Sequence, residues 1–371
     1  MANRPEHQHF IPKSYLKKFA IKKGKSKFFL EAKQLGSDRI YRDMSTRDIC
    51  VQSNLYTVPD EDIEKRYVLE NYYAHNVDAA YPEIYDILTD EKRNYISTDQ
   101  KYKILYTVIS LYFRTPKFLN AISFADDLEL EKSVERQDGR GLIKIEWNDG
   151  YKSLFHVDDL NEEKLRRREF NRIKFLRTHL EEWHNFVYNK NHGVINVFKV
   201  PHSVPLITSD NPIQIGSDHA DVNLFSPDNF IQLPLGPHLL LWIAPYSINN
   251  DRSQLNKIYR QYRDESFAVT SNSTVERLAE RWIFGQPGSI SQHISDQIRF
   301  NKPEVAEPLV EGLIKKTYEL MQLVSLMERH GLASIIVANK VKEMRRLAIF
   351  KDSLELQGII EALAKRGFLT V

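Results

Sequence analysis

The sequence predicts an α+β protein that is predominantly helical, with a central mixed or antiparallel β region of short strands. Two observations support this class. Helical spacing of apolar residues dominates residues 98–113 and 161–189, whereas residues 194–244 are rich in β-branched and aromatic residues interrupted by prolines. The 371 residues are 42% hydrophobic and 27% charged, with mean hydropathy −0.46. This composition is typical of a globular protein and excludes collagen-like and low-complexity classes.

The start of the chain predicts a short helix and a hairpin. Pro12 suits a first helical turn, and apolar residues four apart follow it as far as residue 19. Two β-rich runs at 27–33 and 39–43 flank a Gly-Ser-Asp turn and predict the hairpin. A further strand is expected at 55–58.

Two helices are predicted between residues 62 and 116. Apolar residues from 62 to 88 fit one helical face, and Pro82 predicts a kink. The second helix starts at Ser97 and is apolar on more than one face, which predicts a buried central position. Pro116 ends or bends it.

The rest of the chain alternates between the two kinds of element. Residues 142–147 alternate apolar and polar side chains and predict a strand, and a long helix runs from Asn161 to about residue 189. The remaining predictions are strands at 194–200, 205–208 and 230–244, helices at 251–267 and 273–282, and several helices after residue 302. The expected organisation is a core domain over 1–300 that carries the site and a helical C-terminal extension over 301–371.

Cysteine content and hydropathy indicate the compartment. Cys50 is the only cysteine, so one chain can form neither an internal disulfide nor a Cys-based zinc site. The first residues lack the apolar stretch of a secretory signal, and no run approaches the ~20 apolar residues of a membrane helix. We therefore expect a cytoplasmic protein without a membrane partner.

Positive charge is local rather than global. The chain has 52 basic and 50 acidic residues, a net charge of +2, so no overall field would attract nucleic acid. Basic residues nevertheless crowd segments 13–27 and 166–177. Such runs are commonly solvated faces, and they also fit phosphate. Nucleic acid or a nucleotide is therefore one expected partner class.

Two polar motifs are candidate site residues. His7 and His9 project to one side of an extended segment and could offer two nitrogens to one metal or phosphate, unless they belong to a flexible leader. Ser209, Asp210 and Asn211 follow an apolar strand and could be presented as a rigid binding loop. An ordinary Asx-turn is the alternative for the second motif.

A third candidate is Arg114, which follows the buried helix. A guanidinium in this position must be paired or must bind an anion, because an unpaired buried charge costs several kcal/mol. Glu70 on the preceding helix is the expected partner. A buried ion pair is thus the structural alternative to an anion site.

These motifs resemble a family of bacterial and phage-borne proteins, domain of unknown function 4238, over about residues 5 to 290. The resemblance is carried by His9-Phe10-Ile11-Pro12, Tyr15-Leu16-Lys17-Lys18-Phe19, Arg114-Thr115-Pro116, Thr208-Ser209-Asp210-Asn211-Pro212 and Leu233-Pro234-Leu235-Gly236-Pro237. It implies that one site is shared by His9, Glu70, Arg114, Ser209, Asp210, Asn211 and Asn272. The family's usual Leu-Ser-Pro is here Leu235-Gly236-Pro237, which puts any role of that hydroxyl in doubt.

The residues favour a nuclease-like phosphodiester hydrolase, and the family's phage-borne members suggest a link to phage defence. His9 would be the general acid or base, Asp210 its partner or a metal ligand, Asn211 a hydrogen-bond donor and Arg114 an anion clamp. His7, Glu70, Ser209 and Asn272 would complete the binding site.

Two other functions fit the same residues. One is a non-catalytic ligand-binding or protein-interaction module, and the other is a nucleotide or glycosidic-bond hydrolase. The sequence contains no P-loop or nucleotide-binding glycine motif and identifies neither a metal nor a cofactor. The C-terminal helices are expected to dock a protein partner or a second copy of the chain.

Overall fold

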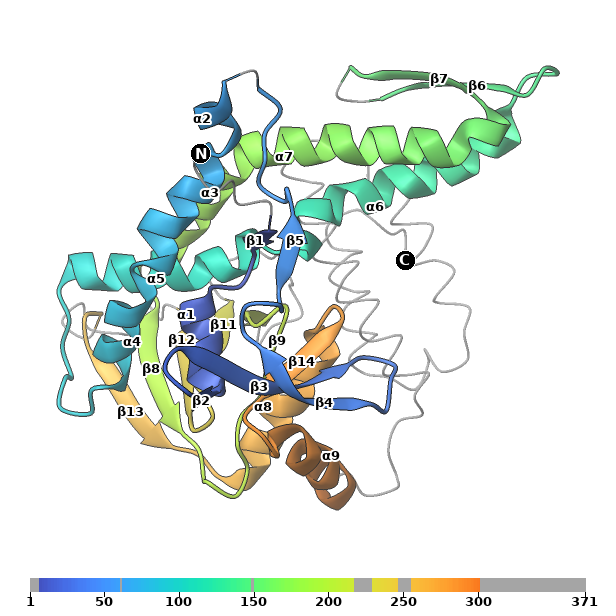
Figure 1. The fold of residues 1–371 in the computed structure, drawn as a ribbon. Coiled ribbons are helices and arrows are strands. Elements are labelled where there is room, and N and C mark those ends of the chain that lie inside the picture. Colours follow the sequence, from blue (N-terminus) through green and yellow to red (C-terminus); the bar gives the residue numbers. More distant parts are fainter. Residues whose placement is uncertain (1–6, 61, 148–149, 217–228, 246–254, 301–371) are drawn as a thin grey trace, which may run out of the picture. The chain divides into compact units, whose positions relative to one another are not determined.

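A computed structural model describes residues 7–60, 62–147, 150–216, 229–245 and 255–300 (Figure 1). The chain forms two compact units. Unit 1 holds the described residues within 1–118, 179–216 and 227–305, and unit 2 holds those within 119–178. The predicted extension at 301–371 lies outside the described residues.

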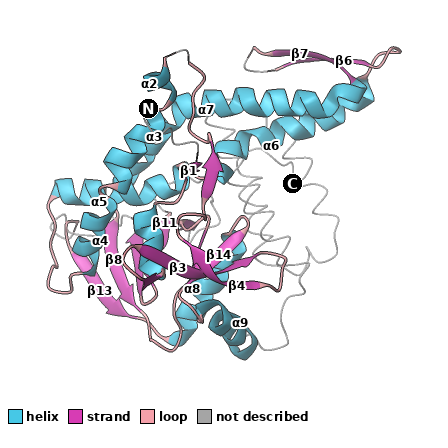
Figure 2. Cartoon of the chain, in the orientation of Figure 1, coloured by secondary structure: helices cyan, strands magenta, loops and turns pink. Residues whose placement is uncertain are grey.

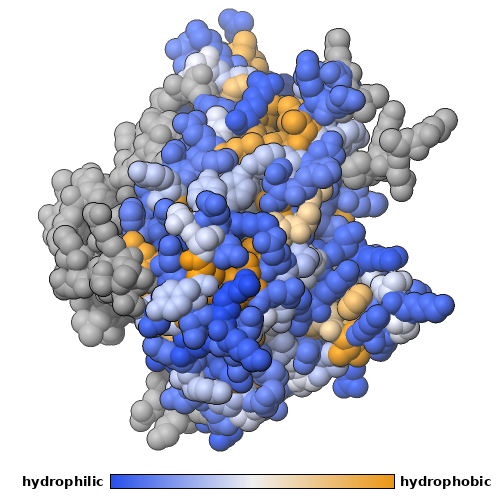
Figure 3. All heavy atoms as spheres, turned by 90° about the vertical axis from the view of Figure 1, so that its left-hand side faces the viewer, coloured by the Kyte–Doolittle hydropathy of each residue, from blue (hydrophilic) through white to orange (hydrophobic). Residues whose placement is uncertain are grey.

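The α+β class is confirmed, with helices and several small antiparallel and mixed sheets (Figure 2). Helices account for 46% of the structure, so the prediction of a predominantly helical chain slightly overstated their share. None of the helices in the described part of the chain is long and apolar enough to cross a membrane. The face in Figure 3 is mostly hydrophilic, with hydrophobic residues in small separate patches.

The first sheet of unit 1 contains the predicted hairpin. Its strand order is β2-β3-β14-β9, with β4 also paired to β3, and all of these pairs are antiparallel. The bounds are β2 (Ile21–Lys23), β3 (Lys27–Gln34), β4 (Ile40–Ser45), β9 (Thr208–Ser209) and β14 (Trp282–Gly285).

A separate antiparallel pair joins β1 (His7–His9) to β5 (Val51–Ser53). The prediction of a strand at 55–58 is wrong, because the strand in this region is β5 and the chain turns directly after it. Leu55 and Tyr56 are buried, so their apolar character reflects core packing and not a sheet ladder.

The second sheet of unit 1 is mixed, with strand order β10-β11-β12-β8-β13. Its strands are β8 (Val194–Lys199), β10 (Gln214–Gly216), β11 (Phe230–Gly236), β12 (Leu239–Ala244) and β13 (Ile258–Tyr262). β13 runs parallel to β8, and the other pairs are antiparallel.

One helix prediction in this region is wrong, and a second is confirmed only in part. The segment expected as a helix at 251–267 contains β13, whose pairing with β8 overrides the local pattern. The helix expected at 273–282 is α8 (Glu265–Leu278), which begins earlier and gives way to β14 at Trp282. α8 packs Ala268 and Val269 against Phe198 and Leu240 of the second sheet. A further helix, α9 (Ser289–Phe300), follows β14.

The N-terminal helices of unit 1 lead to the central helix α5 (Thr98–Phe113). α5 starts with a capping box between Ser97 and Gln100, and it is buried on several faces as predicted. The single kinked helix expected at 62–88 is instead several pieces, with Pro82 in the first turn of the last one, where its missing N–H costs no bond. The pieces are α2 (Ile63–Arg66), α3 (Val68–Tyr73), a π turn η2 (Ala74–Asp78) and α4 (Tyr81–Thr89).

Unit 2 is built on two helices and a hairpin. α6 (Pro116–Ser133), which the sequence did not predict, and the predicted long helix α7 (Leu160–Lys190) each extend from unit 2 into unit 1. Between them lie η3 (Val134–Arg136), the hairpin of β6 (Leu142–Glu146) and β7 (Lys152–His156), and η4 (Val157–Asp159). Buried Arg167 pairs with Asp126, so part of the basic run at 166–177 is structural.

Candidate functional site

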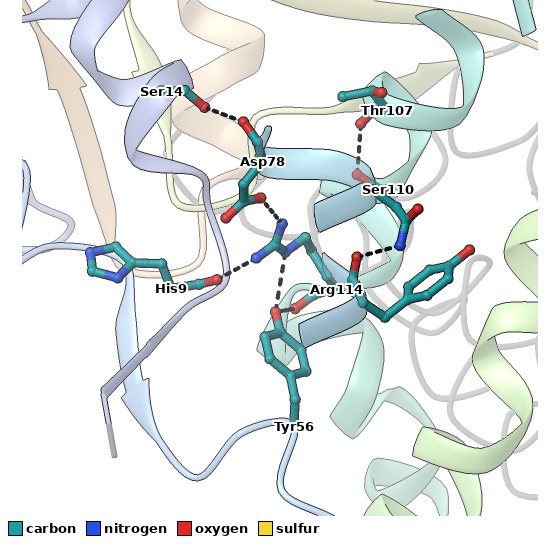
Figure 4. Close-up of polar contacts among 9 residues, drawn as sticks. His9, Ser14, Tyr56, Asp78, Thr107, Ser110 and Arg114 are labelled. Atoms are coloured by element: carbon teal, nitrogen blue, oxygen red, sulfur yellow. Dashed lines mark hydrogen bonds and ion pairs between the residues drawn. The ribbon is translucent and has the colours of Figure 1, made fainter. Parts of the chain in front are cut away.

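Arg114 is the centre of a buried polar cluster in unit 1. The residue caps α5 and is 1% exposed. Its guanidinium donates to Asp78 Oδ1 at 2.6 Å, to the backbone carbonyl of His9 at 2.5 Å and to the Tyr56 hydroxyl at 3.4 Å (Figure 4). Tyr56 in turn donates its hydroxyl proton to the Arg114 carbonyl at 2.5 Å. These contacts fix the N-terminal segment, the loop after β5 and the end of α5 to one another.

The carboxylate that pairs with Arg114 is Asp78 and not the expected Glu70. Asp78 is the last residue of the π turn η2, eight residues after Glu70. Burial alone would lower the pKa of Arg114, but Asp78 and Tyr56 outweigh it and raise that pKa. The guanidinium therefore stays charged, and its bonds go to the protein's own groups.

His9 joins this cluster through its backbone carbonyl, and its half-buried imidazole points away from Arg114 (Figure 4). β1 holds its backbone in extended form opposite Val51, as predicted for this segment. Nε2 is buried and makes no hydrogen bond to any described residue. Burial, reinforced by the positive charge of Lys13, lowers the pKa of His9 to about 4. The ring is therefore neutral near pH 7.

The two residues before His9 behave differently. His7 is exposed, with Nδ1 at 3.4 Å from Ser53 Oγ. Gln8 is fully buried, accepts a hydrogen bond from Tyr56 N at 2.6 Å and donates to Thr57 Oγ1 at 3.2 Å. Gln8 thus anchors β1, a role that sequence reasoning did not assign to it.

Glu70 lies on α3 in the electrostatic environment of the same cations. Its Oε2 is buried and has no hydrogen-bond partner among the described residues. Burial raises the pKa of Glu70, Arg114 and Lys13 lower it, and Asp78 raises it further, with a net increase. The pKa of Glu70 is therefore raised and that of His9 is lowered, and both shifts favour the uncharged form of the group.

Asp210 has a different environment, directly after β9. Its Oδ1 accepts from Glu280 N at 2.9 Å, and its Oδ2 accepts from Arg281 N at 2.9 Å and Trp282 N at 3.2 Å. Burial raises the pKa of Asp210 to about 6, while these N–H groups act in the opposite direction. Both carboxylate oxygens thus hold the connection from α8 to β14.

The neighbours of Asp210 also bind the backbone. Ser209 Oγ accepts from Asn211 N at 3.1 Å, and Asn211 Nδ2 donates to the Leu278 carbonyl at 3.0 Å. Asn272 on α8 accepts from Ile207 N at 3.0 Å and donates to the Pro205 carbonyl at 2.9 Å. The Asn211 and Asn272 amides thus attach the loop to α8. These backbone bonds explain why polar residues occur in apolar surroundings here, and no ligand is needed to explain them.

The residues around His9 and those around Asp210 are linked by contacts of core residues and not by the side chains of the predicted site. Tyr15 shares a 2.6 Å hydrogen bond with Thr208, and Phe10 N donates to the Cys50 carbonyl at 3.0 Å. Burial raises the pKa of the Cys50 thiol, and the charge of Asp210 raises it further. Among the described residues, no hydrogen bond joins the His9 side chain to Asp210.

The family profile described as "Protein of unknown function (DUF4238)" matches residues 7–289. The chain belongs to this family. No curated protein and no solved structure matches the chain. Membership in DUF4238 therefore indicates no activity, and a function can be inferred only from the side chains of the site.

The motif Leu235-Gly236-Pro237 has a glycine where DUF4238 proteins usually have a serine, and the structure has room for a side chain at this position. Gly236 ends β11, and a Cβ built there would lie 3.6 Å from the Tyr85 hydroxyl and 3.7 Å from the Lys18 carbonyl. Both distances are ordinary van der Waals contacts. A serine would fit at this position with polar groups beside it.

No group of three or more His, Cys, Asp or Glu side chains in the described ranges is placed to hold a metal ion. Among the predicted site residues, those with a buried polar atom that has no described hydrogen-bond partner are His9, Glu70 and Asn211. Sequence reasoning found all three. It did not find Asp78 or Tyr56, because their importance depends on the π turn and on a loop.

Proposed function

We propose that this DUF4238 protein is a nuclease-like phosphodiester hydrolase whose acid–base groups are His9 and Glu70. One observation carries the proposal. The two groups have pKa values displaced in opposite directions, each has a buried polar atom without a described partner, and both lie in the field of Lys13 and Arg114. Titratable groups whose environments separate their protonation states are the usual basis of acid–base assignments.

The proposed step is direct attack of water on phosphorus. Neutral His9 accepts a proton from the water through Nε2 as the new P–O bond forms. Glu70, whose raised pKa favours the protonated form, donates a proton to the leaving oxygen as the old P–O bond breaks. Lys13 is exposed and can contact the anionic phosphate, whose negative charge would raise the pKa of His9 toward a better base.

In this proposal Arg114 and Asp210 are positioning residues. Arg114 holds the His9 backbone through the 2.5 Å contact and adds positive potential, while Asp210 holds the chain between α8 and β14. This differs from the anion clamp and metal ligand expected from sequence. Both side chains already use their charged atoms within the protein.

The saturation of Arg114 and Asp210 also favours the second candidate, a non-catalytic ligand-binding or protein-interaction module. In that case the cluster stabilises the fold, and His9 and Glu70 bind a ligand without chemistry. A nucleotide or glycosidic-bond hydrolase would use the same acid–base pair on another substrate. We further propose a cytoplasmic location, supported by the free thiol of buried Cys50. Binding through residues 301–371 and a link to phage defence stay predictions.

The experiment compares wild type with His9→Asn and Glu70→Gln on radiolabelled RNA and DNA, a nitrophenyl phosphodiester, nucleotides and nitrophenyl glycosides, with and without divalent metal. Glu83→Gln is the matched control, because Glu83 is exposed on α4. We expect phosphodiester cleavage by wild type and the control, and a loss of about 10² to 10⁴ in the other two variants. Cleavage of another substrate alone would replace the substrate class. If wild type cleaves nothing, the binding module becomes the better account.

A further inference from the structure

Positive charge is concentrated in one segment of unit 1, residues 13–47. The segment contains eleven Lys and Arg residues and three Asp and Glu residues, a formal charge of +8, whereas the whole chain carries +2. One of the three acids is unavailable to balance these cations, because buried Glu31 accepts from Gly288 N at 3.1 Å and Ile290 N at 3.0 Å. Lys33 is likewise only partly exposed and pairs at 3.9 Å with Glu276 outside the segment, so the remaining surface charge of the segment is still strongly positive.

The β2–β3 hairpin, whose backbone is drawn in Figure 1, contains part of this charge. Lys22, Lys25 and Lys27 are exposed and form no ion pair with any described residue, whereas Lys23 pairs with Asp43 at 2.5 Å. Lys25 lies in the turn that Gly24 opens with φ of +72°. Three uncompensated ammonium groups thus follow one another around the hairpin.

An aromatic ring lies among these cations. Lys22 is directly opposite Phe28 in the antiparallel register, so the two side chains project from the same face of the sheet. The ammonium of Lys17 lies 4.9 Å from the centre of the half-buried Phe28 ring. This face therefore combines two positive charges with an aromatic surface.

The basic surface continues to the candidate site along the first helix. Lys17 follows Lys13 by four residues through α1 (Lys13–Leu16) and the 3-10 turn η1 (Lys17–Phe19), and both side chains are exposed. Residues four apart are neighbours on a helical surface. Lys13, like Arg114, is a cation whose charge acts on both His9 and Glu70.

We propose that the β2–β3 hairpin and Lys17 bind a single strand of nucleic acid and lead it toward His9 and Glu70. Spaced ammonium groups that follow a phosphate backbone, with an aromatic ring for stacking, are typical of single-strand binding. An anionic membrane fits less well, because Ile21, at 36% exposure, is the one large hydrophobic residue of β2 or β3 among those exposed in the described structure. This inference deepens the proposed hydrolase by naming its substrate, and that assignment rests on the proposed function.

The test measures strand binding separately from cleavage. Fluorescence anisotropy of labelled 20-nucleotide RNA and DNA strands is followed between 50 and 200 mM NaCl, with wild type and with His9→Asn, which prevents the proposed hydrolysis. The hairpin variant is Lys22→Ala/Lys25→Ala/Lys27→Ala. Its matched control is Lys65→Ala/Lys92→Ala/Lys132→Ala, since these lysines are also exposed.

Each phosphate contact contributes about −0.7 to the slope of log K against log salt concentration for a single strand. Removal of three contacts should reduce the slope by about 2, which removes an approximately 20-fold salt effect over this range. The control variant should keep the wild-type slope. Equal slopes for the two triple variants, or binding to phosphatidylserine vesicles without strand binding, would overturn the proposal.

The two proposals fail in different ways. Salt-dependent strand binding by the hairpin without cleavage by wild type supports the binding surface and contradicts the hydrolase. Cleavage of a nitrophenyl phosphodiester that depends on His9, without strand binding, contradicts the surface and leaves the hydrolase intact.

Discussion

Replacement of Asp210 by asparagine distinguishes the observed role of this residue from an ordinary Asx-turn. In Asp210, one carboxylate oxygen accepts from two backbone N–H groups and the other accepts from one. An asparagine can retain the oxygen with two bonds, but its NH₂ group then faces the Glu280 N–H. One charge-assisted hydrogen bond is lost, and the partly buried Glu280 N–H loses its acceptor.

The expected cost follows from these two terms. A hydrogen bond to a charged group is worth about 1.5–3 kcal/mol, and an unsatisfied buried donor costs about 1–3 kcal/mol. Because the two terms overlap, we expect Asp210→Asn to lower the free energy of unfolding by about 3 kcal/mol. Asp210→Ala should cost more, since all three N–H groups lose their acceptor.

The assay is urea unfolding at pH 7.5, with Asp264→Asn as the matched control. Asp264 caps the other end of the same helix with a single bond to Phe267 N at 2.8 Å, and asparagine caps almost equally well. The control should change stability by only a few tenths of a kcal/mol. If Asp210→Asn is as mild as the control, the account of Asp210 as a backbone anchor is refuted.

Three further outcomes follow from the structure. The pKa of His9 is lowered from 6.5 to about 4, so folding excludes its proton, and stability should fall by about 2 kcal/mol from pH 7.5 to pH 5. Urea unfolding of His9→Asn at both pH values should show a stability loss that is smaller by this amount. The same pH dependence in wild type and His9→Asn would contradict the lowered pKa of His9. Asp78→Ala should destabilise by about 3–5 kcal/mol by leaving Arg114 unpaired, against less than about 0.5 kcal/mol for exposed Asp86→Ala. Gly236→Ser should leave the melting temperature within a few degrees, and a loss of folding would show that the space beside Tyr85 is not available.

The sequence predicted the elements whose signal is local. The helices at 98–113 and 160–190 have long amphipathic or apolar patterns and clear starts, and the 27–45 hairpin has its turn residues. β13 was predicted as helix because its strand character depends on parallel pairing with β8, about 60 residues away. Sequence periodicity contains no information about that partner.

The candidate site was predicted in the same uneven way. The burial of Arg114 followed from the apolar helix before it, and the need for a partner followed from its charge. Asp78, which pairs with Arg114 in place of Glu70, lies in a π turn that the sequence pattern did not predict. The bonds of Asp210 and Asn272 to distant backbone groups likewise appear only in the fold.

The pH dependence of kcat/KM for phosphodiester cleavage by wild type and Glu70→Gln tests the central claim most directly. Glu70 has a raised pKa and acts as the acid, so activity should fall as pH rises through that pKa. Glu70→Gln should lose about 10² to 10⁴ in kcat/KM and should also lack this alkaline limb, while Glu83→Gln keeps both. A folded Glu70→Gln variant that retains the wild-type rate and the alkaline limb would contradict the assignment of Glu70 as the acid.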